Sequence, residues 1–487
     1  MPLCRKCGFD SAPYLEETQT NTITGRVALR NRLSELDALI SSLTAERQRL
    51  QDVADAIIYP ILSLPVETTT EIFRRCTPAQ SNLGKSPSEA PWVLAQVCRR
   101  WRQIAINTPY LWQSLLFRDD EASMELLHLW LSRSGRLPLK LNLTSVDPSR
   151  SASLVETSLL HCHRWQDVKF GLPSGSFSGL DLRGVSLPLL QSISLRSVLW
   201  SSERVVDTFT ITDAPSLRHL DVSALPTMKL DIPWAPMTTL TLVQNVSLTE
   251  CMSLLKECRN LVNLIVSTSG PAATHTDLVT LTSLKTLSCN LGDASVLKHL
   301  TLPHLLRLTV TSFDGAHVPV FSTFINRSTC PLQFLTVTSP ISLSFLAPFL
   351  RAVPGSTSDV ELTWHRMRLE HIFSALQSMD ILPELKHLRL HARNRTCDEE
   401  YHKLLEMLRA RVEARIPLES VTLKITIRQQ FNPRMMPHSS WIRQLRELVS
   451  AGLQVDITIE SFDSKTHVVL DSSAQGAFFC LFFKPVF

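Results

Sequence analysis

The sequence predicts an α/β protein in which N-terminal helices precede a long, irregular solenoid of strand-and-return units. Two observations carry this prediction. Before residue 117, apolar side chains recur at spacings of three and four residues, which is typical of amphipathic helices. From residue 190 onward, short alternating apolar runs return every 20 to 27 residues, and self-similarity at such a period indicates a repeat architecture.

Composition and charge narrow the class of protein. The chain has 487 residues, 44% hydrophobic and 19% charged, so it can bury a sizeable core. A net charge of +4 is small for this length and gives no reason to expect a nucleic acid or a membrane as partner. We find no signal-peptide pattern and no apolar run of ~18 residues. The 11 cysteines are mostly isolated, so we expect a cytoplasmic and/or nuclear protein.

Residues 1–25 are predicted to form a disordered tail. The tail contains one Cys-x-x-Cys pair, Cys4 and Cys7, whereas a structural zinc ion needs four ligands. No second pair or nearby histidine completes the set. We predict no metal and no cofactor, although the sequence leaves open whether this pair binds a metal.

Residues 26–58 are predicted to form one long helix with a heptad pattern, which is typical of a coiled-coil seam. The seam positions are Leu29, Leu33, Leu36, Ile40, Leu43, Arg47, Leu50, Ala54 and Ile57. Two interpretations stay open. Two copies of the chain could pair through this seam as a homodimer, or the helix could pack on the chain's own later domains. The charged Arg47 and the small Ala54 weaken the seam.

Residues 59–117 form a second helical region that is rich in large apolar side chains. Pro65 can open a helix because its ring presets φ, and Glu67 and Glu71 place negative charge near the positive helix end. A second helix is predicted by apolar residues that share one face: Val93, Val97, Trp101, Ile104 and Ala105. About 50 residues cannot bury so much apolar surface alone, so either the rest of the chain or a partner covers it.

This region resembles the F-box, particularly its fungal members. Four motifs in order carry the resemblance: Leu64-Pro65-x-Glu67, Ile72-Phe73, Val97-Cys98-Arg99-Arg100-Trp101 and Pro109-x-Leu111-Trp112. The family implies helices that dock on a Skp-type adaptor within a cullin complex. The residues expected to dock, or to shape the docking helices, are Leu64, Pro65, Ile72, Phe73, Val97, Trp101 and Trp112. Phe73 and Trp101 could instead form the core of the domain, and the sequence does not separate the two roles.

Residues 118–470 are predicted to form the solenoid. A Leu-x-x-Leu-x-Leu core at a period of 20–29 residues is the leucine-rich-repeat signature, and such units stack into a horseshoe. The middle positions are Ile193, Leu220, Leu240, Leu264, Leu287, Leu308, Leu335, Val360, Leu388 and Val421. The repeats are degenerate, because the expected Asn or Cys appears clearly only at Asn245. Return segments are predicted to be helical at 249–257, 343–352, 370–379, 399–414 and 440–451. Residues 471–487 form a C-terminal tail that could cap the last strand.

The side chains between the repeat leucines are expected to face solvent on the concave side. They are varied and polar, as expected of a surface that binds another protein. They are Gln191, Ser192, Ser194, Arg218, His219, Asp221, Lys285, Thr286, Ser288, Lys386, His387 and Arg389. Because these side chains include both positive and negative charges, they do not identify the ligand.

The sequence gives no support for catalysis by this chain. Phosphate-loop, nucleophile-elbow and His-x-x-x-His zinc patterns are absent. The run His161-Cys162-His163 cannot converge on one metal from a helix, because adjacent side chains point in different directions. Arg409, Arg411 and Arg415 are interpreted as a solvated helix face rather than an anion site.

An F-box followed by leucine-rich repeats resembles the substrate-recognition subunit of an SCF-type cullin–RING ubiquitin ligase. The resemblance implies that the F-box docks on the adaptor and that the repeats bind a target protein, without catalysis. The alternative is a non-enzymatic scaffold that self-associates through its N-terminal helix without ubiquitin transfer. A hydrolase would need a polar pocket with a perturbed acid–base pair. The sequence does not name the target or say whether its recognition needs phosphorylation.

Overall fold

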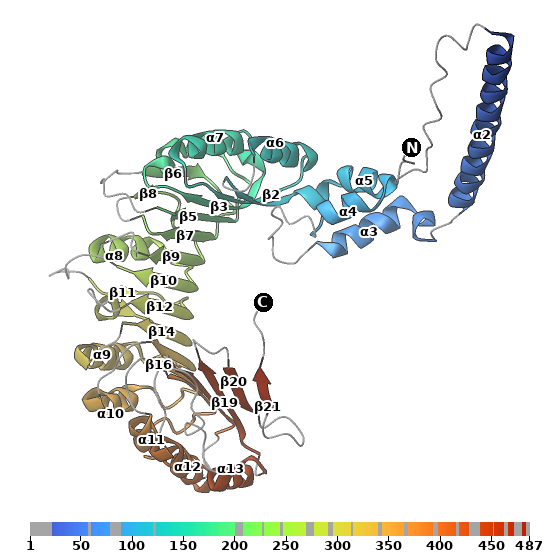
Figure 1. Ribbon diagram of the computed structural model, residues 1–487. Coiled ribbons are helices and arrows are strands. Elements are labelled where there is room, and N and C mark those ends of the chain that lie inside the picture. Colours follow the sequence, from blue (N-terminus) through green and yellow to red (C-terminus); the bar gives the residue numbers. More distant parts are fainter. Residues whose placement is uncertain are drawn as a thin grey trace.

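The structure is a computed structural model. It describes residues 22–56, 60–77, 89–119, 123–199, 208–225, 228–243, 247–268, 277–290, 296–312, 315–338, 343–364, 369–392, 398–414, 418–427, 439–450, 452–461, 466–471 and 480–483. These residues form a curved arc of stacked strands with helices on its outer side, a small helical domain at one end of the arc, and one long separate helix (Figure 1). This arrangement confirms the predicted α/β class.

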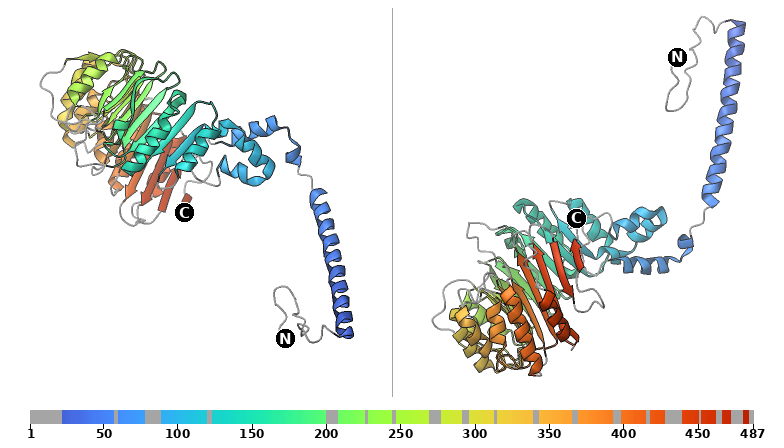
Figure 2. Two further views of the ribbon diagram at one scale, coloured as in Figure 1. Left: turned by 90° about the horizontal axis from the view of Figure 1, so that it is seen from above. Right: turned by 60° about the horizontal axis from the view of Figure 1, so that its bottom comes forward.

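The long helix α2 (Ile23–Ala56) stands away from the arc in every view (Figures 1 and 2). Its described residues are exposed along its length, apart from the buried Gly25 and the half-buried Leu29. The interpretation of a helix packed on the later domains is therefore wrong. The coiled coil stays a prediction.

The helical domain follows, and its elements are the 3-10 helix η1 (Pro60–Ser63), α3 (Val66–Cys76), α4 (Trp92–Val97), α5 (Arg99–Ile106) and the 3-10 helix η2 (Pro109–Trp112). The predicted single helix around Trp101 is wrong, because the chain breaks at Cys98, which is extended with φ −156° and ψ 171°. The Cys98 side chain accepts a hydrogen bond from the Trp101 backbone N–H at 3.4 Å and so caps α5. Residues 78–88 of the polar insertion lie outside the described residues.

Among the described residues, sixteen strands pair in one sheet. They are β1 (Ser114–Arg118), β2 (Leu139–Thr144), β3 (Trp165–Leu172), β5 (Ser192–Ser197), β7 (His219–Ser223), β9 (Thr239–Val243), β10 (Asn263–Ser267), β12 (Thr286–Asn290), β14 (Arg307–Thr311), β15 (Phe334–Thr338), β16 (Asp359–Trp364), β17 (His387–Ala392), β18 (Ser420–Ile427), β19 (Gln454–Ser461), β20 (Thr466–Asp471) and β21 (Cys480–Phe483). The sheet is parallel from β1 to β19, and β20 and β21 add antiparallel strands at its end. The C-terminal tail therefore extends the sheet through β21.

The predicted repeat positions are register partners. Ile193 of β5 pairs with Leu220 of β7, which pairs with Leu240 of β9. The same row continues through Leu264, Leu287, Leu308, Leu335, Val360, Leu388, Val421 and Val455. All of these side chains are buried, so one apolar row runs along the arc beneath the sheet.

The return segments cover the convex side. The helices there are α6 (Met124–Arg133), α7 (Pro148–Leu159), α8 (Leu248–Glu257), α9 (Val318–Ser328), α10 (Leu343–Ala352), α11 (Glu370–Leu376), α12 (Asp398–Glu413) and α13 (Ser439–Ser450). The shorter elements include the 3-10 helices η3 (Cys162–Arg164), η4 (Ser176–Gly179), η5 (Val296–His299) and η6 (Gly315–His317). One small sheet pairs β4 (Asp181–Ser186), β6 (Thr208–Asp213) and β8 (Lys229–Asp231). A second small sheet pairs β11 (Val279–Thr280) with β13 (Leu300–Thr301). The five predicted return helices are present. Helix α9 and both small sheets were not predicted from the sequence.

Two local features recur at or just before the start of the strands. Proline recurs in a turn just before the strand, as in Leu302-Pro303-His304-Leu305, where the Leu305 N–H donates to the Leu302 carbonyl at 3.3 Å. At the start of the strands, one carbonyl accepts from two successive N–H groups of the next unit. The Gln191 carbonyl, for example, accepts from Arg218 and His219 at 3.0 and 3.1 Å. This pattern holds the units in register where the Asn of regular repeats is missing. Asn245 itself lies outside the described residues.

Arg411 corrects one sequence interpretation. Its side chain is fully buried and donates to the backbone carbonyls of Leu376, Ile381 and Leu382, so it is not part of a solvated face. Arg409 is half-buried, and Arg415 lies outside the described residues, as do Cys4 and Cys7. No helix among the described residues has the length and apolar character needed to cross a membrane.

Candidate adaptor-docking and target-binding surfaces

Helix α3 is amphipathic, with one face in the core and one in solvent. Phe73 is fully buried, whereas Val66 and Ile72 expose 49% and 37% of their surface. Thr69 is also buried, and its hydroxyl donates to the Pro65 carbonyl at 3.0 Å. This bond satisfies the buried hydroxyl within the helix.

Arginines of α5 hold the neighbouring segments in place. The Arg100 guanidinium donates to the Leu64 carbonyl at 3.0 Å and also to the Leu62 carbonyl, so it ties the start of α3 to α5. Arg102 donates to the Ala95 carbonyl at 2.8 Å and satisfies the end of α4. These basic residues therefore position the apolar segments of the domain.

A cluster of tryptophans joins this domain to the solenoid. The Trp112 and Trp130 rings lie 4.9 Å apart, and Trp92 approaches both at 5.7 and 5.9 Å, in edge-to-face arrangements. Trp112 also donates from Nε1 to the Ala105 carbonyl at 2.8 Å. Trp130 belongs to α6, the first return helix, so one shared core links the helical domain and the arc.

The seven predicted site residues divide into two groups. Phe73 and Trp112 are fully buried, and Trp101 is half-buried with its ring 5.0 Å from Phe73, so these three build the core. For Phe73 and Trp101 this is the core role that the sequence left open, and the buried Trp112 can act only by shaping the docking helices. The remaining four lie at the surface: Pro65, Ile72 and Val97 are exposed, and Leu64 is half-buried.

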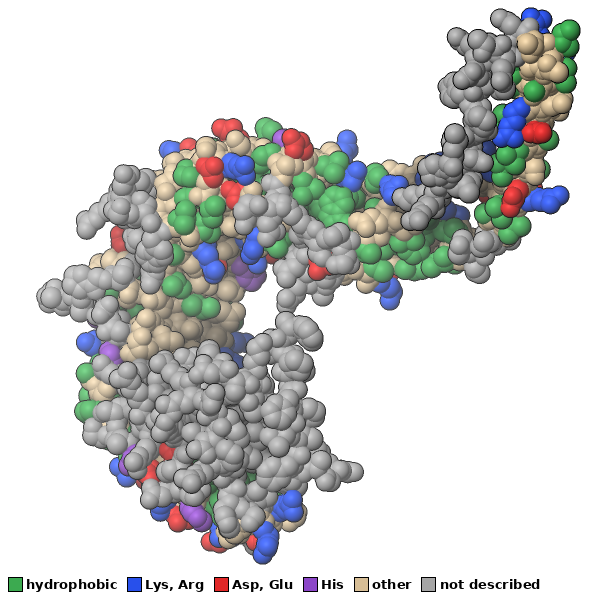
Figure 3. All heavy atoms as spheres, viewed as in Figure 1, with side chains coloured by type: hydrophobic (Ala, Val, Ile, Leu, Met, Phe, Trp, Pro, Cys, Tyr) green, Lys and Arg blue, Asp and Glu red, His purple; other side chains and the backbone are tan. Residues whose placement is uncertain are grey.

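The structure adds three exposed apolar residues that the predicted site left out. Ile61, Val66 and Val93 expose 47%, 49% and 37% of their surface. The exposed aliphatic and proline residues of the described part of segment 61–97, here called the apolar ledge, are Ile61, Pro65, Val66, Ile72, Val93 and Val97. Figure 3 shows hydrophobic side chains gathered over α3. Val93 could have been found from its i, i+4 spacing with Val97, because the two share one face of α4.

The concave face of the arc carries three rows of side chains. The register aligns the inward positions of every strand from β1 to β19, as in the row Lys140, Asp167, Ser192 and His219. The predicted concave residues within the strands, such as Ser194, lie at these half-buried or exposed positions. Gln191, Arg218, Lys285 and Lys386 instead precede the strands, where their carbonyls accept the paired N–H groups.

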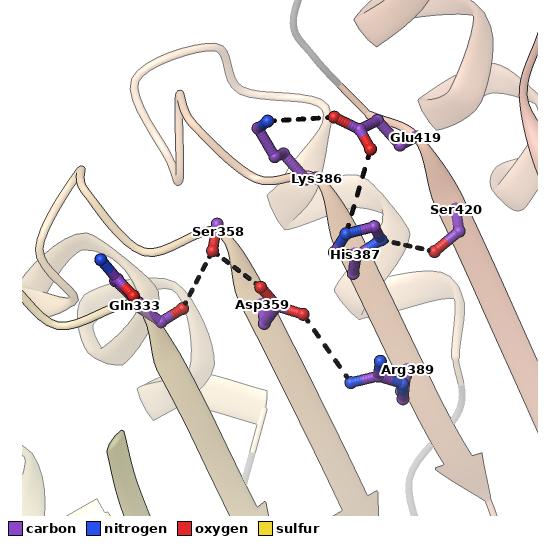
Figure 4. Close-up of polar contacts among 8 residues, drawn as sticks. All are labelled: Gln333, Ser358, Asp359, Lys386, His387, Arg389, Glu419 and Ser420. Atoms are coloured by element: carbon purple, nitrogen blue, oxygen red, sulfur yellow. Dashed lines mark hydrogen bonds and ion pairs between the residues drawn. The ribbon is translucent and has the colours of Figure 1, made fainter. Parts of the chain in front are cut away.

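The C-terminal part of this face carries a connected set of charged and polar groups (Figure 4). Lys386 Nζ lies 3.1 Å from Glu419 Oε1, and His387 Nδ1 lies 2.8 Å from the Ser420 hydroxyl. Asp359 accepts from the Ser358 hydroxyl at 2.7 Å and lies 3.9 Å from Arg389 Nη1. The charges here are largely balanced by their own neighbours.

Three features of the described residues bear on metal binding and reactivity. No three His, Cys, Asp or Glu side chains among them could hold a metal ion. A cavity of about 360 Å³ lies between α8 and β11, and Leu255, Lys256, Arg259 and Thr280 help to line it. Burial raises the pKa of the thiols of Cys251 and Cys289 to about 12, so both stay protonated at neutral pH.

A family model described as F-box-like matches residues 61–118. The chain contains an F-box-like domain. The match begins at the exposed Ile61 and ends at the last residue of β1, so it includes the whole apolar ledge. Such a domain suggests an SCF-type substrate-adaptor role, and F-box domains generally bind Skp1-type adaptors.

Comparison with solved structures finds a chain of the Toll–Spätzle complex of Drosophila, at 16% identity and a TM-score of 0.25. The alignment covers 66% of this chain and 44% of that chain, so the present chain matches less than half of its neighbour's length. No curated protein matches the chain. The assignment of the repeats therefore relies on the register and burial of their strands, and that of the F-box-like domain on its own family model.

Proposed function

We propose that the chain is the substrate-recognition subunit of an SCF-type cullin–RING ubiquitin ligase. The apolar ledge of the F-box-like domain docks on a Skp-type adaptor, and the concave face of the arc binds a target protein. The chain contributes proximity rather than chemistry, because tethering raises the effective concentration of target lysines near the conjugating enzyme. Such a protein works in the cytoplasm or the nucleus.

The observation that carries this proposal is the apolar ledge itself. The F-box-like domain already has a complete core of Phe73, Trp112 and neighbouring residues, yet Ile61, Val66 and Val97 stay 47–58% exposed. Exposed apolar residues grouped on one small domain mark a protein-binding surface. Three members of the ledge, Pro65, Ile72 and Val97, belong to the motifs that give the domain its family resemblance.

The tryptophan cluster is a second observation that supports the proposal. Because Trp112 and Trp130 pack at 4.9 Å, the adaptor-docking domain and the first repeat share a core. A target bound on the arc is then held at a constant position relative to the adaptor. A flexible linker at this point would spread the target over a larger volume and lower its effective concentration.

Co-purification with a Skp-type adaptor tests the proposal. The wild-type chain should recover the adaptor, and the double variant Val66→Glu with Ile72→Glu should lose it, because two carboxylates would enter an apolar interface. Leu160→Glu is the matched control, since Leu160 is 75% exposed but lies at the end of α7, away from the ledge. Failure of the wild-type chain to recover the adaptor would overturn the proposal. Phe73→Ala is unsuitable, because it would open a cavity in the core.

A second candidate is a scaffold that self-associates through α2 without ubiquitin transfer. The observation in its favour is the exposed seam of α2, where Leu33, Ile40 and Leu43 are 58%, 60% and 56% exposed. Such a stripe, repeated over four heptads, fits a second copy of the same helix. The two candidates differ in their partners: the scaffold forms a homodimer and recovers no adaptor. A receptor that dimerises would show both.

A further inference from the structure

The N-terminal part of the concave face carries a line of three cations. Lys140 of β2, Lys169 of β3 and Arg196 of β5 are all exposed and lie on three adjacent strands. Among the described residues, none of the three lies within ion-pair distance of an acid. At the other end of the arc, Lys386 and Arg389 lie near Glu419 and Asp359, as Figure 4 shows. The two ends of one face therefore differ in how their charges are balanced.

The register places the three cations on a diagonal. Lys169 lies opposite Asn142 and Ser194, whereas Lys140 and Arg196 are each displaced by two residues, in opposite directions. With strands ~4.8 Å apart and a rise of ~3.3 Å per residue, each step along this diagonal is about 8 Å. In an extended peptide, alternate side chains lie ~6.8 Å apart on one side. Long lysine and arginine side chains can adjust to the small difference.

Two carboxylates, Asp167 and Asp221, lie on the same face as this line, here called the cationic diagonal, so its three cations exceed the acids on the inward positions of β2, β3, β5 and β7 by one. Asp221 accepts from the hydroxyls of Ser194 and Ser223 at 2.9 and 2.8 Å. Asp167 lies opposite Lys140 in the register, and its Oδ1 atom is buried without a hydrogen-bond partner. Beyond β7, the inward positions of β9 and β10 are neutral, from Thr239 and Thr241 to Asn263 and Ile265. No carboxylate on these two strands would repel an anionic ligand.

We propose that the cationic diagonal binds an extended segment of the target that carries acidic residues, Asp or Glu, at every second position. The inference rests on the proposed function, in which the concave face receives the target. Charge complementarity selects the segment and steers its approach, and each exposed pair adds a small share of the affinity. The neutral hydroxyl-rich strands beyond β7 then accommodate the uncharged part of the ligand. The acidic segment would bind at the end of the arc next to the F-box-like domain.

The test measures fluorescence anisotropy of labelled peptides with the purified full-length chain. One peptide has three glutamates at alternate positions, a second has glutamine in their place, and a third has phosphoserine. At 50 mM NaCl, we expect the glutamate peptide to bind about tenfold more tightly than the glutamine peptide. Raising the salt to 300 mM should remove most of this preference.

The triple variant Lys140→Glu, Lys169→Glu and Arg196→Glu should lose the preference. Its matched control is Lys229→Glu, Arg259→Glu and Lys298→Glu, which makes the same change of charge at exposed positions of the return segments. Equal binding of the glutamate and glutamine peptides overturns the proposal, as does an equal loss in both triple variants. Binding of the phosphoserine peptide alone overturns it in favour of a phosphate site. The assay contains no adaptor, so it can succeed or fail independently of the adaptor test.

Discussion

The Arg411 side chain donates from Nη2 to the backbone carbonyl of Ile381, 30 residues earlier, at 2.7 Å. Two other arginines reach back over the same interval: Arg327 to the Leu297 carbonyl at 2.7 Å, and Arg164 to the Ser134 hydroxyl at 2.6 Å. Each arginine satisfies groups in the return segment of the preceding unit. These bonds connect neighbouring units on the convex side, where carbonyls at helix ends would otherwise lack donors.

Replacing Arg411 with methionine should destabilise the C-terminal part of the arc. The change leaves the carbonyls of Leu376, Ile381 and Leu382 without a donor, and we expect a loss of about 3 kcal/mol or more in the free energy of unfolding. Burial lowers the pKa of Arg411 to about 10, so the side chain remains charged at neutral pH. Urea denaturation measures the loss. Arg409→Met, two residues earlier in the same helix at a half-buried position, is the control and should cost less than about 0.5 kcal/mol.

Truncating Trp112 to alanine should weaken the connection between the F-box-like domain and the arc. The residue is fully buried between Trp92, Trp130 and the Ala105 carbonyl, so we expect a loss of about 3–5 kcal/mol. Limited proteolysis should then cut between the two parts faster than in the wild type. Tyr110→Ala in the same 3-10 helix removes a ring that is 37% exposed and should cost less than about 1 kcal/mol. Equal proteolysis of both variants would contradict the shared core.

The thiols of Cys251, Cys258 and Cys289 should resist iodoacetamide in the folded chain at pH 8. Burial raises the pKa of each thiol to about 12, and the thiolate is the reactive form. Cys76 is exposed and should be modified under the same conditions, as peptide mass spectrometry would show. Rapid modification of Cys251 without unfolding would contradict the buried position.

These raised pKa values also imply that the stability depends on pH. The folded state keeps the thiols neutral, whereas the unfolded chain ionises them near pH 9, the ordinary value. Their contribution to stability is therefore complete below pH 9 and is lost as the pH rises toward 12. Urea midpoints measured between pH 8 and 10.5 should fall at the alkaline end. Replacing Cys251 and Cys258 with alanine should make this fall smaller.

The double variant Leu36→Lys with Leu43→Lys should turn a dimer of the chain into a monomer in light scattering. Both leucines are exposed seam residues of α2, and two charges would disrupt the apolar contact between helices. Ser34→Lys with Ser41→Lys is the matched control, because these positions keep the same spacing on another face of the helix. An unchanged mass in the seam variant, or a monomeric wild type, would end the coiled-coil interpretation.

Local patterns were enough to predict the architecture. The leucines at a 20–27-residue period set the strands, and Leu220, Leu240 and Leu264 indeed pair in one register. The reason is physical: an apolar side chain every second residue can be buried only on one side of a sheet, so the period alone orders the stack. The F-box motifs were likewise local in sequence, and a family model confirms the domain that they predicted.

Only the tertiary structure decided which apolar and charged residues are free to bind. Phe73 and Val66 look alike in a sequence, yet one is fully buried and the other 49% exposed, because burial depends on how α3 meets α5. The sequence predicted Arg411 to be a surface charge, but in the fold the end of α11 lies beside it and its Leu376 carbonyl accepts from the Arg411 side chain. The cationic diagonal likewise depends on the register of three strands whose cations lie 29 and 27 residues apart in the chain. Contacts between distant segments depend on the geometry of the whole fold, which local periodicity does not contain.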